Sequence, residues 1–255
     1  MTAWQKAIKY TAIAFAIFLC VSIVGGILSL FTSISVFFGG KDAVGDMQTY
    51  EITGTITRLH IEIGASNFVI KNDDHFHVES NHKYLTVEEK DGLLKLTEKK
   101  KFWNVGKGNG RLELYIPADT VFEKVEFESG AGTVEIQELL TDRLDFELGA
   151  GNVQIDRLVA AGADIDGGAG RIIINGASLA NLDMDMGVGE LRLTGSLTGN
   201  CSLDLGVGAT KLALAGTKEN YRIDVDKGLG EITIDGSKVS DGTVYGNGTN
   251  ALKID

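Results

Sequence analysis

The sequence is poor in the residues that cross-link or interrupt a fold, with two cysteines and one proline among 255 residues. Cys20 lies inside an apolar segment, so an intramolecular disulfide with Cys201 is implausible and no disulfide framework is expected. The 33 glycines come without proline and without a Gly-X-Y period, which excludes collagen and proline-rich disorder. The fold must therefore depend on its own apolar core.

Basic patches and catalytic motifs are also missing. The formal net charge is −11 at pH 7, and the sequence has no basic stripe of the kind found in nucleic-acid-binding domains. Residues 176–180 lack the final glycine of a G-x-S-x-G motif, and the Gly-x-Gly segments lack the third glycine of a dinucleotide-binding loop. We therefore expect a protein that is not an enzyme, has no catalytic residues or cofactor, and binds no nucleic acid.

Residues 12–38 form a stretch of 27 residues without a charge. A helix of this length reaches about 40 Å and can cross the roughly 30 Å hydrocarbon core of a bilayer. The stretch therefore predicts one transmembrane helix, acting as an uncleaved signal-anchor. A cleaved signal peptide, with its shorter apolar core of about 7–15 residues, is an alternative. A lipoprotein signal ending at Cys20 is another, although the bulky Leu19 departs from the small residue that such a site needs.

The charges on either side of this stretch predict its orientation. Lys6 and Lys9 precede it, whereas Asp42 and Asp46 follow it. The positive-inside rule places residues 1–11 in the cytoplasm. The bulk of the chain then lies outside the cell membrane, after a linker over residues 39–49. This makes a single-pass membrane protein with an acidic extracytoplasmic part that attracts divalent cations or basic partners.

A repeat occupies the second half of the chain. Gly-x-Gly begins at residue 130 and recurs at a spacing of 19 residues up to residue 206, and the sixth copy follows after 22 residues. An alternating segment follows each glycine pair, with two inward, mostly apolar positions separated by an outward, mostly polar one, which indicates a half-buried strand. The apolar column before the glycines is Phe127, Phe146, Ile165, Met184, Leu203 and Val225. The two columns after them are Val134, Val153, Ile172, Leu191, Thr210, Ile232 and Ile136, Ile155, Ile174, Leu193, Leu212, Ile234.

One such unit cannot bury its apolar face alone, but stacked units bury a continuous core. Glycine suits the corner between the two strands because a side chain would forbid the backbone angles there. The repeat therefore predicts an all-β, parallel β-solenoid of about 19-residue coils over residues 126–255. Residues 59–70 have the same layout of strand, corner and strand, and residues 50–125 are expected to form irregular, wider or capping coils. The additional residues of the 22-residue step fall near residues 218–221, a polar stretch that predicts a loop.

Three features together resemble a known family: the strand, glycine and strand unit at residues 61–70, the segment 112–117 leading into 125–127, and the reiterated Gly-Ala-Gly-x-Val-x-Ile. They are similar to the bacterial putative-adhesin domain family of unknown function, often found behind a membrane anchor. The resemblance covers roughly residues 50–255. It implies a β-solenoid on the cell-envelope side, and it supplies no catalytic residues.

Two acidic columns flank the corners. The first consists of Glu128, Glu147, Asp166, Asp185, Asp204 and Asp226. The second consists of Glu126, Asp145, Asp164, Asp183 and Asp224, with Ser202 in the fifth position. Like residues of a parallel stack lie about 4.8 Å apart, so each column carries a repulsion unless it is hydrated or binds cations. The first column is a candidate row for a divalent cation such as calcium, and the alternative is a solvated face that opposes aggregation.

Two further groups of residues are candidate sites. His75, His77 and His82 lie close to Asp73 and Asp74, and the first two histidines share one strand face, which permits metal chelation. The alternative is a set of exposed histidines. Residues 99–110 are basic and glycine-rich and predict an exposed loop. Within it, the candidates for a contact with a ligand or the membrane surface are Lys101, Phe102, Trp103 and Lys107.

These features favour an adhesin-like or scaffold protein that contacts other envelope proteins or surface polymers. An accessory or sensory role in a membrane or envelope stress response is an alternative. A polysaccharide-active β-helix enzyme is a weaker one, because it needs a cleft with paired carboxylates in surroundings that raise a pKa.

Overall fold

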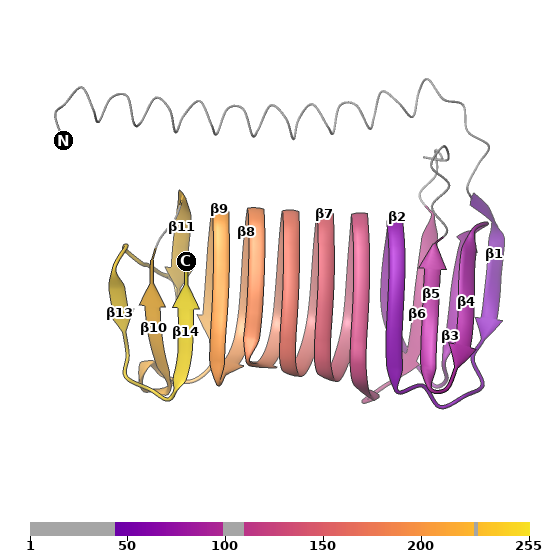
Figure 1. Cartoon of the computed structure of the whole chain (residues 1–255), viewed down its shortest axis with the longest axis horizontal. Helices are drawn as coiled ribbons and strands as arrows, with labels where there is room; N and C mark the ends of the chain where they lie inside the picture. The colour runs from indigo at the N-terminus through magenta and orange to yellow at the C-terminus, as the bar shows by residue number, and fades with distance from the viewer. Residues whose placement is uncertain (1–43, 99–109, 227–228) are drawn as a thin grey trace, which may run out of the picture. The chain divides into compact units, whose positions relative to one another are not determined.

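The computed structural model describes residues 44–98, 110–226 and 229–255, which form an all-β solenoid (Figure 1). Its strands lie side by side along the solenoid axis in one 14-stranded sheet. Within these ranges no helix is long and apolar enough to cross a membrane. The predicted cytoplasmic segment 1–11 and transmembrane helix 12–38 lie outside the described residues. Of the predicted linker 39–49, the last six residues belong to strand β1 (Val44–Glu51).

The regular coils are formed by β7 (Val121–Ala180), β8 (Leu182–Thr198) and β9 (Asn200–Leu214). They pair in parallel with a register of 19 residues, so that Asp164 lies opposite Asp183 and Asp183 lies opposite Ser202. Strand β7 is 60 residues long because the backbone keeps its strand conformation through successive corners. The predicted 19-residue parallel coil is therefore confirmed.

Strand β2 (Arg58–Asp73) is the coil that precedes the array. It pairs in parallel with the start of β7, with Ile61 opposite Phe127 and Ser66 opposite Gly132. The predicted kinship of residues 59–70 with the repeat is thus confirmed, including the serine that replaces the second corner glycine.

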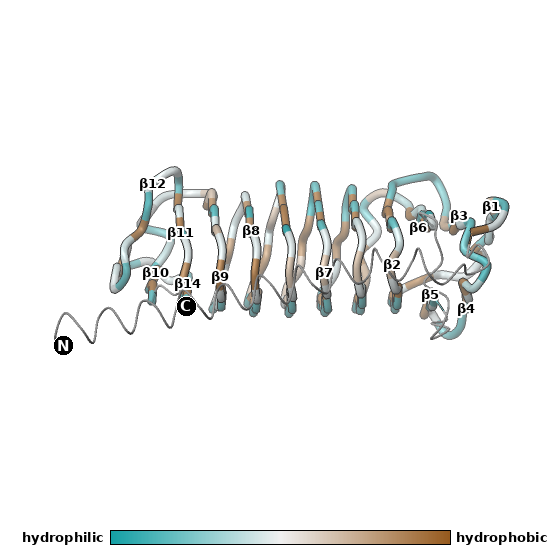
Figure 2. The backbone as a smooth tube through the Cα atoms, turned by 90° about the horizontal axis from the view of Figure 1, so that it is seen from above, coloured by the Kyte–Doolittle hydropathy of each residue, from teal (hydrophilic) through white to brown (hydrophobic). Residues whose placement is uncertain are grey.

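The core lies inside the coils, and Figure 2 shows hydrophobic and hydrophilic positions alternating along them. The columns expected before and after the corners are buried from β2 to β9. Phe127 stacks between Phe68 and Phe146, with ring centroids 5.3 and 5.2 Å apart. Each such side chain contributes about 1.5–3 kcal/mol when it is fully buried. A further buried set, not predicted from the sequence, follows each second strand: Leu139, Thr141, Leu158, Ala160, Ala177, Leu179 and Leu197.

The corner glycines stack on one another from coil to coil. A Cβ atom at Gly189 would lie 1.8 Å from the carbonyl oxygen of Gly170, and one at Gly208 would lie 1.8 Å from that of Gly189. Both residues also have positive φ angles, 152° and 156°. Glycine is therefore required here by the close approach of neighbouring backbones as well as by the backbone angle.

The N-terminal end of the array is closed by short strands that include antiparallel pairs. Strand β1 pairs with β3 (His77–His82), and β3 pairs with β6 (Arg111–Pro117), in both cases antiparallel. Strands β4 (Leu85–Lys90) and β5 (Leu93–Glu98) form an antiparallel hairpin. Among these short strands, β5 and β6 pair with β2 in parallel. Such strands cover the edge that a bare coil would expose.

The C-terminal end departs from the predicted regular array. The remaining elements are η1 (Lys218–Asn220), β10 (Tyr221–Val225), β11 (Leu229–Ile234), β12 (Ser237–Lys238), β13 (Thr243–Tyr245) and β14 (Asn250–Ile254). Strand β11 pairs directly with β9, but β14 lies between β9 and β10. Val225 therefore stacks on Ile254, and Ile254 stacks on Leu203. The predicted loop at 218–221 is a 3₁₀ turn over its first three residues, whereas Tyr221 is buried and its hydroxyl donates to the carbonyl oxygen of Ala215 at 2.9 Å.

Candidate functional site

An open groove of about 990 Å³ follows the glycine corners from β2 to β9. Its lining repeats from coil to coil, with a carboxylate, the residue after it and a corner glycine. The residue after the carboxylate is apolar in several coils, as with Leu148 and Met186. The acidic residues that line the groove are Glu62, Glu98, Glu128, Glu147, Asp166, Asp185 and Asp204. The groove is therefore acidic along its length.

Five of the six residues predicted as the first acidic column are brought together in this groove. The sixth, Asp226, does not line it. Its backbone N–H donates to the carbonyl oxygen of Ile254 in β14, and β14 separates β10 from β9. The prediction of a six-membered column is therefore wrong at its last member, because the C-terminal strand takes the position next to Asp204.

The second acidic column lies two residues earlier on the same strands and does not line the groove. Lys253 stands between Ser202 and Asp224 in the stack, so this column ends in a mixed-charge row. At its other end Glu126 forms ion pairs with Lys124 and, at 3.3 Å, with His60. These contacts neutralise part of the second column within the protein.

The five groove carboxylates from β7 to β9 are different. Within the part of the chain that the structure describes, Glu128, Glu147, Asp166, Asp185 and Asp204 make no ion pair, and all five are exposed. Several acids elsewhere are paired. Glu190, for example, contacts Arg171, Arg192 and Lys211 at 3.1, 2.7 and 3.4 Å. The negative charge of these five carboxylates is thus not neutralised by ion pairs among the described residues.

The stacking of like charges affects the acidity of the ladders. Partial desolvation of the exposed Asp185 carboxylate raises its pKa, and so do the neighbouring charges of Asp204, Asp183 and Asp166. Asp164 has a raised pKa for the same reasons, burial first and then its acidic neighbours. Each ladder therefore stores repulsion that a bound cation would relieve.

The N-terminal end of the groove is built differently. The Glu98 carboxylate accepts hydrogen bonds from the backbone N–H of Gly64 at 2.7 Å and from the Ser66 hydroxyl at 3.0 Å, and it lies 3.3 Å from His82 Nδ1. Burial raises the pKa of Glu98, but His82 and these hydrogen bonds outweigh it and lower the pKa to about 2. The hydrogen bond with Glu98 in turn raises the pKa of His82. This carboxylate is therefore already satisfied.

Sequence reasoning missed Glu62 and Glu98. Glu62 could have been found, because it lies opposite Glu128 and precedes a corner glycine by two residues, as the members of the first column do. Glu98 gave no signal, since it reaches the groove through a hairpin outside the repeat. His82 was grouped with His75 and His77, but the structure places it beside Glu98 instead, whereas His75 and His77 do lie together. The predicted contact residues Lys101, Phe102, Trp103 and Lys107 lie outside the described residues.

The groove does not form a calcium cage by itself. Calcium takes six to eight oxygen ligands at about 2.3–2.6 Å. Two neighbouring coils supply one carboxylate each, which is at most four oxygens. The evenly spaced row is better suited to a ligand that carries several positive charges along its length.

Solved structures resemble the chain at low sequence identity. A putative adhesin from Bacteroides fragilis is 13% identical, with a TM-score of 0.44, over 85% of this chain and 100% of its own. A putative cell adhesion protein from Clostridium sporogenes is also 13% identical, with a TM-score of 0.36, over 82% of this chain and 92% of its own. A putative adhesin from Parabacteroides distasonis is 14% identical, with a TM-score of 0.31, over 84% and 99%.

No curated protein matches the sequence. A family model does match, over residues 56–253, a span that begins just before β2 and includes all the regular coils, the groove and most of the C-terminal end. The chain therefore belongs to the Toastrack DUF4097 family.

Proposed function

We propose that this protein is an adhesin-like interaction protein of the cell envelope, with no enzymatic activity, whose acidic groove receives an extended, positively charged segment of an envelope partner. The observation that carries the proposal is the row of five exposed carboxylates that line the groove and make no ion pair with any described residue. Residues 12–38 hold the protein in the cell membrane, and the solenoid lies on the extracytoplasmic side. The uncharged length of this segment and the lysines that precede it support this arrangement.

An extended basic chain fits the groove because charges and shape both repeat along it. The carboxylates recur once per coil, about 4.8 Å apart, and the groove is open along its side. Lysine or arginine side chains of a bound strand can therefore reach a carboxylate at each coil along the groove. Such a row also steers a polycation to the groove before contact, an effect that weakens as salt increases.

Binding of an oligolysine peptide tests the groove directly. We expect fluorescence anisotropy to show binding to the full-length protein at low salt that weakens at physiological salt. The double variant Asp166→Asn/Asp185→Asn should lose at least fivefold in affinity. The matched control Glu123→Gln/Asp142→Asn removes two exposed acids outside the groove and should bind as the wild type does. Equal losses in both double variants would mean that net charge alone attracts the peptide, against the proposal.

Photo-crosslinking in cells tests the partner. A photoreactive residue at position 188, an exposed site beside the groove glycines, should capture an envelope protein or surface polymer. The same residue at position 244, which is exposed in β13 and does not line the groove, is the control. Capture of the same products from both positions would argue against the groove as the binding surface.

The raised pKa of Asp185 is a feature that a polysaccharide-active enzyme would also show. The groove nevertheless offers a poor arrangement of carboxylates for such an enzyme. Glycoside hydrolysis uses two carboxylates in different environments, one acid and one base or nucleophile. From β7 to β9 the groove instead presents the same arrangement in coil after coil. We expect no turnover of wall or capsule polysaccharides by the purified protein. Turnover that Asp185→Asn abolishes would overturn the non-enzymatic proposal.

A further inference from the structure

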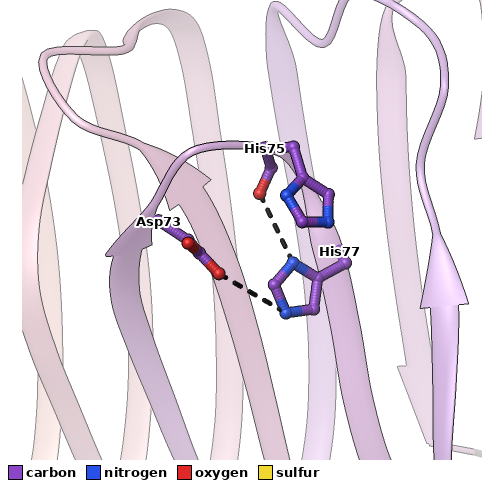
Figure 3. Close-up of side chains that lie close together, drawn as sticks. All are labelled: Asp73, His75 and His77. Atoms are coloured by element: carbon purple, nitrogen blue, oxygen red, sulfur yellow. Dashed lines mark hydrogen bonds and ion pairs between the residues drawn. The ribbon is translucent and has the colours of Figure 1, made fainter.

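We propose that Asp73, His75 and His77 form a binding site for a divalent transition-metal ion of the zinc class (Figure 3). One ligand atom from each residue lies within 4.8 Å of the other two. The site is at the N-terminal end of the solenoid, at the turn from β2 to β3, and it shares no residue with the acidic groove.

The local sequence builds this cluster. Strand β2 ends at Asp73 and β3 begins at His77. Phe76, between the two histidines, packs edge-on against Phe122 with ring centroids 6.3 Å apart. His75 lies in the bend before β3, and its ring stacks on that of His77 with centroids 4.6 Å apart. The shared face that the sequence predicts is therefore present.

His77 is the fixed member of the cluster. Its side chain is 9% exposed, and its ring stacks on Tyr115 with centroids 4.2 Å apart and an angle of 7° between the ring planes. Its Nδ1 lies 3.4 Å from the carbonyl oxygen of His75 and its Nε2 lies 3.8 Å from Asp73 Oδ2. A carbonyl oxygen only accepts, so Nδ1 carries the proton and Nε2 presents its lone pair beside Asp73. This is the orientation that a histidine ligand needs, with its second nitrogen held by a backbone carbonyl.

His75 and Asp73 are the adjustable members. The side chain of His75 is 55% exposed and that of Asp73 is 39% exposed. His75 Nδ1 contacts Asp74, and His75 Nε2 lies 3.5 Å from Glu51 Oε2. Whichever nitrogen binds a metal, a carboxylate lies next to the other one. Glu51, at the end of β1, lies outside the three-residue cluster and contacts it through His75.

The ligand types select the metal. Two imidazoles and a carboxylate suit zinc and the neighbouring first-row ions, whereas calcium and magnesium prefer oxygen ligands alone. Ligand atoms around a tetrahedral zinc lie about 3.3 Å apart, given bond lengths of about 2.0–2.1 Å. The described donors need to draw together by about 1.5 Å at most, which rotation of the two exposed side chains provides.

A bound ion would connect β2 directly with β3, and it would reach β1 through the contact of His75 with Glu51. Asp73 is the last residue of β2, His77 is the first of β3, and Glu51 is the last of β1. The metal would therefore fasten the antiparallel strands at the N-terminal end to the first coil. Zinc should slow hydrogen exchange in β1 and β3 and leave exchange in β8 and β9 unchanged.

Titration of chelator-treated, full-length protein in detergent with zinc alone tests the proposal. We expect one equivalent to bind, and cobalt in its place to give the intense visible absorption of a tetrahedral site with nitrogen ligands. His75→Ala and Asp73→Asn should each weaken zinc binding at least tenfold. His60→Ala is the matched control, since His60 also lies between carboxylates, those of Glu62 and Glu126, and it should leave the affinity unchanged.

Three results would overturn the assignment. One is the absence of zinc binding by the wild-type protein. Another is the same affinity in the wild type and in the double variant Asp73→Asn/His75→Ala, with circular dichroism showing both folded. The third is a loss of zinc binding on Asp185→Asn but not on His75→Ala, which would assign the metal to the acidic groove.

Discussion

Replacing Asp185 by asparagine should stabilise the protein at neutral pH. Asp185 lies opposite Asp166 on one side and opposite Asp204 on the other. At a spacing of about 4.8 Å, two unit charges repel by about 0.9 kcal/mol in water, and screening at 0.15 M salt reduces this to about 0.5 kcal/mol. The two neighbours together therefore cost about 1 kcal/mol, which the unfolded chain does not bear. Asparagine keeps the size of the side chain and removes the charge.

Thermal unfolding followed by circular dichroism measures this effect. For a domain of this size, about 1 kcal/mol corresponds to a rise in Tm of roughly 2–4 °C. In 1 M salt the screening length is about 3 Å, so the gain should fall below half. Asp142→Asn, an exposed aspartate outside the ladders, is the control and should change stability by less than about 0.5 kcal/mol. A variant no more stable than the wild type, or a gain that salt does not reduce, would refute the reasoning.

The same repulsion has a pH dependence of definite sign. The pKa of Asp185 in the folded protein lies above its ordinary value of 3.8, so the folded state takes up the proton before the unfolded state does. The wild-type protein therefore recovers this stability as the pH falls through the raised pKa towards 3.8. The advantage of Asp185→Asn should shrink over the same interval.

Three further expectations concern the corners, the end of the groove and the anchor. Gly189→Ala should lower the free energy of unfolding, measured in urea, by about 2 kcal/mol or more, because the new Cβ would meet the carbonyl oxygen of Gly170. Gly162→Ala is the control and should be nearly neutral, since no atom lies within 4 Å of its new Cβ. Equal losses of stability in the two variants would contradict the stacking argument. The pKa of Glu98 is about 2, below its ordinary value of 4.5, so the stabilisation by this carboxylate is present above pH 4.5 and lost as the pH falls towards 2. Glu98→Gln should therefore reduce the dependence of stability on pH in that interval. An unchanged pH dependence would count against a stabilising role of the Glu98 carboxylate. Full-length protein should stay in the membrane fraction after alkaline carbonate extraction, whereas release would rule out residues 12–38 as a spanning segment.

The sequence was sufficient for the regular coils because each repeat meets the same physical demands. A position that faces the core in one coil faces it in the next, so columns such as Phe127 and Phe146 are readable without a structure. The further buried set that follows each second strand was missed because it contains small residues such as Ala160 and Ala177 and shows no strict alternation. Glycine was expected at the corners for its backbone angles, whereas the contact between stacked backbones needs two coils to be seen together.

The candidate site was likewise predictable only in those parts that depend on local spacing. Local spacing predicted that Glu128 and its equivalents form a row, and that His75 and His77 share a face. Contacts between distant segments were not predictable, since nothing in the spacing connects Glu98 with His82 or places the strand that contains Lys253 beside β9. The departure from the repeat at Asp226 has this cause as well.

The position of β14 also constrains the order in which the solenoid can assemble. Strand β10 precedes β14 in the chain, yet β14 lies between β10 and β9 in the sheet. Growth by adding each new coil to the last one therefore stops after β9 on this side, with the edge of β9 open. Strand β10 must wait for β14, or must first pair with β9 wrongly and then give up that place. Docking of β14 is thus the step at which we expect folding to slow, and the edge of β9 is the surface that a folding intermediate would expose to other chains.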